Sequence, residues 1–277
     1  MIGQQRLQQQ INEEMSNKTF PQFAIFVGEE GCGKKTLMEE LVGSNWEFWY
    51  ICRDVKVDTI REMIAFAQGN QSRCAYVIPD AQDMSLQSKN SILKLVEEPH
   101  RNATFLMSIT SEDDLLGTIK SRGRIYRFDT YTDRELKSVV TRQDALDSKF
   151  IVDVANTIDD VLKLNLIDLD EFRKQINVIL DKADTLSIGN LLKSSKNMAF
   201  KDSDEGINLK LYLQGFEAVA LERLKQAEDD DVKMYRDIII ETSSKLNDLK
   251  IKSVNRQMLY EIWLLNIREI REKYGYQ

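Results

Sequence analysis

The residues with the clearest chemical potential form a glycine-rich segment near the start of the chain. It reads Gly28-Glu29-Glu30-Gly31-Cys32-Gly33-Lys34, between an apolar run and a helix-like stretch. A phosphate-binding loop requires this context, because glycines let backbone N–H groups curl around phosphate oxygens at a helix N-terminus. Gly28, Gly31, Gly33 and Lys34 are therefore predicted to contact the phosphates of a nucleotide such as ATP. The alternative is a glycine turn followed by a surface lysine.

The residue after Lys34 departs from the phosphate-loop pattern. A Ser or Thr at that position ligates Mg²⁺, but this chain has Lys35, and the hydroxyl comes one residue later at Thr36. One residue turns a helical side chain by about 100°, so Thr36 does not simply replace the missing ligand. Lys35 and Thr36 remain candidate nucleotide-contacting residues. We expect nucleotide binding to survive this change and tight Mg²⁺ binding to be lost.

A second nucleotide signature, a hydrophobic strand that ends in Asp-Glu, is also degraded. The candidate is the run from Cys74 to Asp80. In one alignment Pro79 takes the metal-holding position, which leaves no side-chain acceptor, and Asp80 takes the position of the base. In the other alignment Asp80 holds the metal and Ala81 leaves no base. Both alignments predict a weak or inactive ATPase.

The elements that would position these residues alternate between strand and helix. Short apolar runs predict strands at 23–27, 46–51, 75–78, 104–109 and 125–128, and helix-like segments such as 57–66 and 87–96 separate them. This alternation predicts a parallel sheet covered on both faces. Later segments carry apolar residues at helical spacing, namely 152–164, 169–180, 209–227, 233–246 and 254–270. We expect an α/β domain at 1–128, a small helical domain at 129–185 and a larger helical domain at 186–277.

Composition narrows the classes of protein that the chain can represent. With a net charge of −7, the chain is not a general binder of polyphosphates, so contact with DNA would require a local basic face or a partner. Three well-separated cysteines and a single histidine argue against a disulfide framework and a zinc site. The first residues are too polar for a signal peptide, and no apolar run approaches the roughly 20 residues that span a bilayer. We expect a cytoplasmic protein without membrane contact.

Two blocks in the middle of the chain carry a family resemblance. Asn90-Ser91-Ile92-Leu93-Lys94-Leu95-Val96-Glu97-Glu98-Pro99 precedes a predicted strand, which is followed by Thr118-Ile119-Lys120-Ser121-Arg122-Gly123. Their order and spacing resemble those of the bacterial clamp-loader ATPases of the AAA+ class, the gamma and delta-prime subunits. The resemblance covers residues 1–130, including Ile2-Gly3-Gln4, where the family's chain passes the adenine pocket. It implies an AAA+ P-loop domain followed by an all-α lid and an all-α collar.

The resemblance implies roles for particular residues. Arg122 matches the arginine that reaches into the ATP site of a neighbouring subunit. The planar, permanently charged guanidinium group of such an arginine stabilises the charge on the transferring phosphoryl group. Thr110 falls near the sensor position at the end of a strand, and the pattern does not separate it from Ser111. The helix that begins near Ser88 resembles the one that follows the template strand, which makes Lys89 a candidate DNA contact. The alternatives are a surface arginine and a solvated helix face.

The chain departs from the family in three places. The last residue of the Ser-Arg-Cys motif is Gly123, although the arginine is kept. About 40 residues separate Lys34 from Cys74, which leaves no room for the zinc module of many relatives. The predicted lid helix carries Asp159 and Asp160 where an active member would offer a basic sensor, and either carboxylate would repel a triphosphate.

The expected function is that of a clamp-loader subunit of delta-prime type, a stator of a replicative DNA polymerase. Such a subunit docks beside related ATPase subunits, donates Arg122 and helps to load a sliding clamp on primer–template DNA. Three alternatives stay open: a gamma-like motor that hydrolyses ATP, a P-loop kinase, and an adaptor that binds no nucleotide. A kinase would need arginines in an acceptor-binding lid, and the helical C-terminal third of the chain offers no such cluster.

Overall fold

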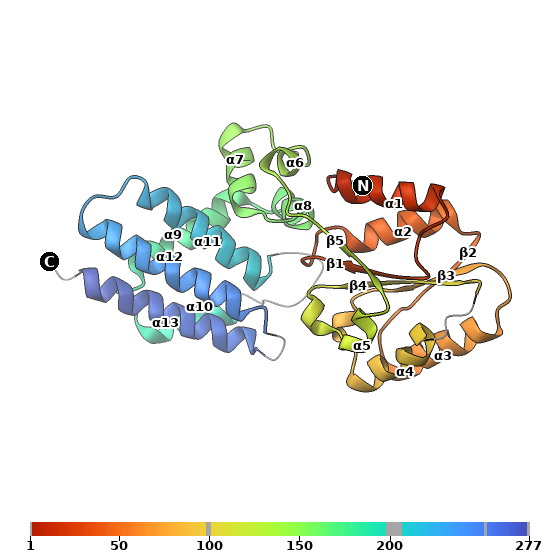
Figure 1. Cartoon of the computed structure of the whole chain (residues 1–277). Coiled ribbons are helices and arrows are strands. Elements are labelled where there is room, and N and C mark those ends of the chain that lie inside the picture. Colours follow the sequence, from red (N-terminus) through yellow and green to blue (C-terminus); the bar gives the residue numbers. More distant parts are fainter. Residues whose placement is uncertain (1, 98–100, 198–206, 252–253, 276–277) are drawn as a thin grey trace. The chain divides into compact units, whose positions relative to one another are not determined.

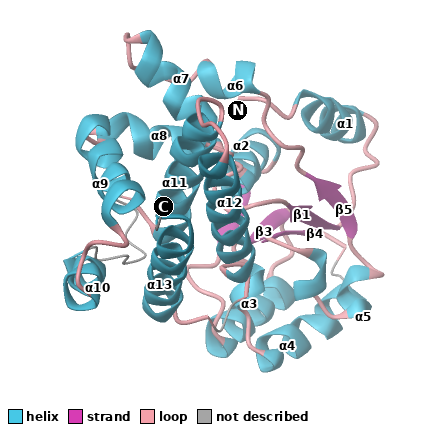
Figure 2. Cartoon of the chain, turned by 90° about the vertical axis from the view of Figure 1, so that its left-hand side faces the viewer, coloured by secondary structure: helices cyan, strands magenta, loops and turns pink. Residues whose placement is uncertain are grey.

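The chain forms two compact units. The computed structural model describes residues 2–97, 101–197, 207–251 and 254–275, so Glu98 and Pro99 of the family motif lie outside the described residues. The first unit contains Met1–Glu135 with Thr157–Asp159, and the second contains Leu136–Asn156 with Asp160–Gln277. All strands of the described residues, drawn in magenta in Figure 2, belong to the first unit.

A parallel five-stranded sheet organises the first unit. Its strand order is β2-β3-β4-β1-β5, and each neighbouring pair is parallel. From β1 the chain runs to the edge strand β2, returns through β3 and β4, and then passes to β5 on the other side of β1. In open α/β sheets ligands bind where the strand order reverses in this way, which here is at the carboxyl end of β1. The strands are β1 (Phe23–Val27), β2 (Phe48–Ile51), β3 (Cys74–Ile78), β4 (Ala103–Ile109) and β5 (Arg124–Arg127).

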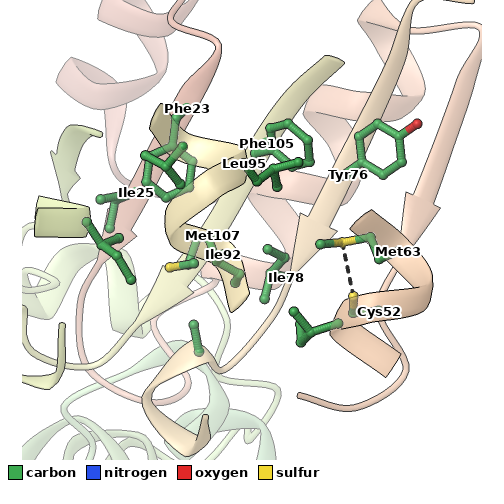
Figure 3. Packing of buried hydrophobic residues seen from close by; sticks show 14 of the residues in the cluster. Phe23, Ile25, Cys52, Met63, Tyr76, Ile78, Ile92, Leu95, Phe105 and Met107 are labelled. Atoms are coloured by element: carbon green, nitrogen blue, oxygen red, sulfur yellow. Dashed lines mark hydrogen bonds between the residues drawn. The ribbon is translucent and has the colours of Figure 1, made fainter. Parts of the chain in front are cut away.

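Helices cover both faces of this sheet (Figure 1). Alternate strand residues point to opposite faces, so Ala24 and Phe26 pack in one cluster with side chains of α1 and α2, including Leu7 and Met38. Phe23, Ile25 and their neighbours pack against the other helices (Figure 3). The helices of this unit are α1 (Gln5–Ser16), α2 (Lys34–Asn45), α3 (Val57–Gly69), α4 (Leu86–Glu97) and α5 (Gly117–Lys120), with short 3₁₀ turns η1 (Ala81–Asp83) and η2 (Glu112–Asp114).

The second unit is helical and has an aromatic core. Its helix α11 is buried around most of its circumference, and Phe216 packs edge-on against Trp263 with ring centroids 4.6 Å apart. The indole N–H of Trp263 donates to the hydroxyl of Thr242 at 3.1 Å. After α6 (Asp133–Lys137), which crosses the boundary between the units, the helices are α7 (Ala145–Val154), α8 (Ile158–Leu166), α9 (Leu169–Lys182), α10 (Ile188–Asn197), α11 (Leu209–Leu224), α12 (Asp230–Asp248) and α13 (Arg256–Gly275).

The predicted fold class, a parallel α/β sheet with flanking helices followed by helices, is confirmed. The helix expected over 152–164 is instead two helices, because α7 ends at Val154 and α8 begins at Ile158. Ala155 is extended, and the Asp160 carboxylate accepts the backbone N–H of Asn156 at 3.1 Å, a capping contact that begins a new helix. The division into three domains stays a prediction.

Candidate functional site

The predicted phosphate loop connects β1 to α2 at the carboxyl end of β1 (Figure 1). Gly31 and Gly33 have φ angles of 81° and 88°, and Gly33 is the N-cap of α2. Side chains with a Cβ rarely adopt this left-handed region, so the two glycines permit the turn. The loop therefore has the strand–turn–helix setting that the sequence predicts.

Lys34 does not extend into solvent. Its side chain is buried, and its Nζ donates to the backbone carbonyls of Gly28 and Glu29, both at 2.7 Å. Burial lowers the pKa of Lys34, and the nearby Cys32 and Asp80 oppose that shift. The ammonium that would meet a terminal phosphate is thus hydrogen-bonded to the loop itself.

Lys35 and Thr36 occupy the first turn of α2, and both are exposed. Neither side chain is held by the core, unlike Leu37 and Met38, which follow them and are buried. Thr36 thus remains one position beyond the residue that would ligate Mg²⁺. Among the described residues, no group of three or more His, Cys, Asp or Glu side chains is arranged to hold a metal ion.

Asp80 follows β3 in a strained backbone conformation. Its φ of 50° lies in the left-handed region, and its N–H donates to the hydroxyl of Ser108 on β4 at 3.0 Å. Ser108 is buried, so this bond fixes the turn after β3. The Asp80 carboxylate is close enough for its charge to act on the pKa of Lys34. It therefore lies near the phosphate loop, where either alignment of the degraded signature requires it.

The two sensor candidates make local contacts after β4. Thr110 Oγ1 donates to the Asp114 carboxylate at 3.1 Å. The Ser111 hydroxyl accepts the backbone N–H of Asp113 at 3.3 Å and caps η2. Lys89, the candidate DNA contact, donates to the backbone carbonyl of Asp114. The three side chains are thus held by the same short segment.

Arg122 lies just beyond the short helix α5. Its Nη1 donates to the Thr118 carbonyl at 3.0 Å, and its Nη2 lies 3.3 Å from Oε1 of Glu97 in α4. The arginine side chain remains 39% exposed, so it can be reached from outside the chain. The next residue, Gly123, packs directly on the sheet, where an added Cβ would lie 2.3 Å from Ile25 Cδ1. A cysteine at this position would therefore require Ile25 to move.

Two further side chains, those of Tyr131 and Gln4, make contacts near the site, and the sequence singled out only Gln4. The hydroxyl of Tyr131 donates to the carbonyl of Cys32 at 2.8 Å, and burial raises the pKa of Tyr131 to about 12. The Gln4 side chain pairs with both backbone groups of Asp129, at 2.6 and 2.8 Å. The opening segment is therefore joined to the residues that follow β5. Tyr131 has no motif around it, so only the fold reveals its contact.

The structure separates the two acids that the sequence left equivalent. Asp160 is buried and accepts the Asn156 N–H. Asp159 belongs to the first unit and lies against the phosphate loop, where a Cβ added to Gly31 would be 2.7 Å from Asp159 Cβ. The hydroxyl oxygen of Thr157 would lie 2.8 Å from the same point. Of the two acids, Asp159 is the one adjacent to the loop.

The sheet order, the loop after its central strand and the flanking helices define the fold of an AAA+ P-loop protein. Solved structures with this fold include a DNA polymerase III gamma subunit-related protein of Thermotoga maritima, with a TM-score of 0.53 and 16% identity, covering 95% of this chain and 99% of that one. The RuvB Holliday junction branch migration motor of Thermotoga maritima matches with a TM-score of 0.51 and 16% identity, covering 99% and 89%. At this identity the likeness shows the fold alone.

The sequence relationship is more specific. Residues 51–132 match the family described as "DNA polymerase III, delta subunit". The chain is 33% identical over 104 residues to DNA polymerase III subunit delta' of Haemophilus influenzae, which covers 34% of this chain and 32% of that protein. The chain therefore spans about a third of the length of the curated relative that it matches. These findings show that part of the chain is similar in sequence to clamp-loader subunits, within a chain that has the AAA+ fold.

None of the described helices combines the length and apolar character needed to cross a membrane.

Proposed function

We propose that this chain is a clamp-loader subunit of delta-prime type that acts as a stator. In this role it docks in the cytoplasm beside related ATPase subunits of a DNA polymerase III assembly. It presents Arg122 to the nucleotide of a neighbour and helps that assembly to place a sliding clamp on primer–template DNA. The chain itself hydrolyses ATP weakly or not at all.

The observation that supports this proposal most is the contrast between Lys34 and Arg122. Lys34 is buried and bonded to two carbonyls of its own loop. Arg122 stands at the end of α5 with 39% of its side chain exposed. Donation to a neighbouring site requires an accessible arginine, and a lysine bonded within its own loop agrees with a site that is left unused. Lys35 at the position of the Mg²⁺-ligating Ser or Thr supports the same proposal, as does Pro79 in the alignment that puts it at the metal-holding position.

A gamma-like motor is the second candidate, and one observation favours it. Asp80 lies near enough to Lys34 to act electrostatically on it, as an acid of an ATPase site would. In this candidate the site opens, and Asp80 with Thr36 supports hydrolysis. The two candidates differ in what the purified chain does with ATP.

Nucleotide binding and phosphate release by the isolated chain, with and without Mg²⁺, test the proposal. The stator predicts no Mg²⁺-dependent turnover, whether or not ATP binds. Steady Mg²⁺-dependent phosphate release would reject the stator and favour the motor, provided that the Lys34→Ala variant abolishes the release. That variant excludes a contaminating ATPase as the source.

A further inference from the structure

Two residues far from the phosphate loop in sequence lie directly on it. A Cβ added to Gly31 would be 2.7 Å from Asp159 Cβ, 2.8 Å from Thr157 Oγ1 and 3.4 Å from Asp159 Oδ2. Thr157 is buried, and Asp159 is partly exposed. Both belong to the first unit, although the chain on either side of Thr157–Asp159 belongs to the second. These few residues therefore pack as a short strap on the loop.

The position of Asp159 opposes nucleotide binding for an electrostatic reason. A phosphate loop holds anions through its backbone N–H groups and its lysine. A carboxylate packed on Gly31 brings a like charge to the place where phosphate oxygens would approach, and the repulsion between close charges is strong where water is scarce. Asp159 also lies in the first turn of α8, where the helix dipole favours an acidic side chain. The acid is therefore stabilised where it stands.

Other groups of the chain reinforce the closed loop. Tyr131 donates to the carbonyl of Cys32, and Lys34 donates to the carbonyls of Gly28 and Glu29. Three loop carbonyls are thus bonded to side chains of this chain, and the Cys32 thiol is buried inside the loop. Burial raises the pKa of that thiol. In this state the Lys34 ammonium is bonded to carbonyls of its own loop, and an incoming phosphate would have to compete for it.

We propose that Thr157 and Asp159 form an intrachain plug that closes the phosphate loop and sets its affinity for nucleotide. Nucleotide enters only when the plug is withdrawn. This inference rests on the proposed function in one respect. If the chain is a stator, the plug is the reason why its phosphate loop, which keeps its glycines and Lys34, stays unused. It assigns to Asp159 the role of a specificity-determining residue against triphosphates.

The test uses the full-length chain and three variants, Asp159→Asn, Asp159→Ala and Thr157→Ala. Asp58→Asn is the matched control, because Asp58 lies on α3 with its side chain 91% exposed. ATP binding is measured by calorimetry with and without Mg²⁺. Modification of Cys32 by N-ethylmaleimide is followed by peptide mass spectrometry, with Cys52 and Cys74 as internal references because they are also buried. The second readout detects opening of the loop without any nucleotide.

Removal of the Asp159 charge is expected to tighten ATP binding by about tenfold or more. Cys32 should react faster in Asp159→Ala than in the wild type while Cys52 and Cys74 stay unchanged, and ATP should protect Cys32 in that variant. Asp58→Asn should match the wild type in both readouts. Asp159→Asn, which keeps the shape of the side chain, separates the effect of charge from that of packing and guards against a misfolded alanine variant.

Two results would overturn the plug. One is ATP affinity in both Asp159 variants equal to that of the wild type, and the other is an unchanged rate of Cys32 modification in Asp159→Ala. Neither result bears on the proposal that the chain is a stator, because that proposal is tested by ATP turnover and by the Arg122 variant. Conversely, Mg²⁺-dependent turnover by the wild type would reject the stator, and the affinity of the Asp159 variants relative to the wild type would still decide the plug.

Discussion

The guanidinium of Arg122 and the carboxylate of Glu97 form an ion pair, with Nη2 3.3 Å from Oε1, between the ends of α5 and α4. Both side chains are substantially exposed, at 39% and 48%. Such a pair contributes at most about 1 kcal/mol to stability, because water screens it. The arginine is thus oriented by Glu97 and by the Thr118 carbonyl, yet remains available to another molecule.

Arg122→Ala should leave the fold intact and impair the assembly. We expect the free energy of unfolding to change by less than about 1 kcal/mol, and the ATPase rate of a reconstituted clamp loader to fall by about 10³-fold or more. Chemical denaturation and phosphate release measure the two effects. The control is Arg61→Ala, which removes another exposed arginine, from α3. An unchanged ATPase rate of the complex would show that Arg122 does not act on the nucleotide of a neighbouring subunit.

Lys34→Ala should affect stability more than function. The variant loses two hydrogen bonds of a buried ammonium and leaves two loop carbonyls without that donor, so we expect a loss of about 1–3 kcal/mol in the free energy of unfolding. Clamp loading by the assembly should change little if the stator leaves this site unused. Lys35→Ala, next to it and exposed, is the control and should be near neutral in both measurements. Collapse of clamp loading in Lys34→Ala alone would show that the site is used.

Two Gly→Ala substitutions should change the free energy of unfolding in opposite directions. Gly31→Ala combines a left-handed backbone with a Cβ 2.7 Å from Asp159 Cβ, and should destabilise the chain by about 2 kcal/mol or more. Gly43→Ala, in helix α2 with no neighbouring atom within 4 Å of the new Cβ, should stabilise it by up to about 1 kcal/mol.

Denaturant titration of these variants also tests the contact between Gly31 and Asp159. The double variant Gly31→Ala with Asp159→Gly should recover part of the loss, because it removes the opposing Cβ. Strict additivity of the two substitutions would indicate that Asp159 does not pack on the loop.

Restoring the cysteine of the family motif should be harmful here. A Cβ at Gly123 would lie 2.3 Å from Ile25 Cδ1, so Gly123→Cys should cost about 1–3 kcal/mol in the free energy of unfolding. Gly117→Cys introduces the same side chain where no neighbouring atom lies within 4 Å of the Cβ, and should cost less. Ile25→Val removes the clashing methyl group, so the double variant with Gly123→Cys should be less destabilised than the sum of the two single changes. Equal losses at positions 117 and 123 would contradict the packing argument.

The sequence by itself determined the sheet and the setting of the loop. Residues 23–27 are apolar throughout and are followed by glycines and Lys34, and this local pattern is enough to specify a buried strand, a turn and a helix start. The order of the motifs around Asn90 and Arg122 also determined the family resemblance, because those motifs are contiguous in the chain. The loss at Lys35 is likewise visible without a structure, since it is a change of residue type at a known spacing, and both alignments of the segment that ends at Asp80 show a degraded signature.

Only the tertiary structure decided which groups face the loop. Tyr131 and Asp159 lie about 100 or more residues from the loop residues that they contact, Cys32 and Gly31, and no local periodicity records such a pairing. The break between α7 and α8 is accompanied by a side-chain cap at Asp160, which the apolar spacing of the segment does not reveal. The physical reason is common to these cases. Local patterns report which face of an element is buried, whereas long-range contacts depend on how the chain crosses between elements, and here those crossings bring an acid from α8 onto a loop built to hold phosphate.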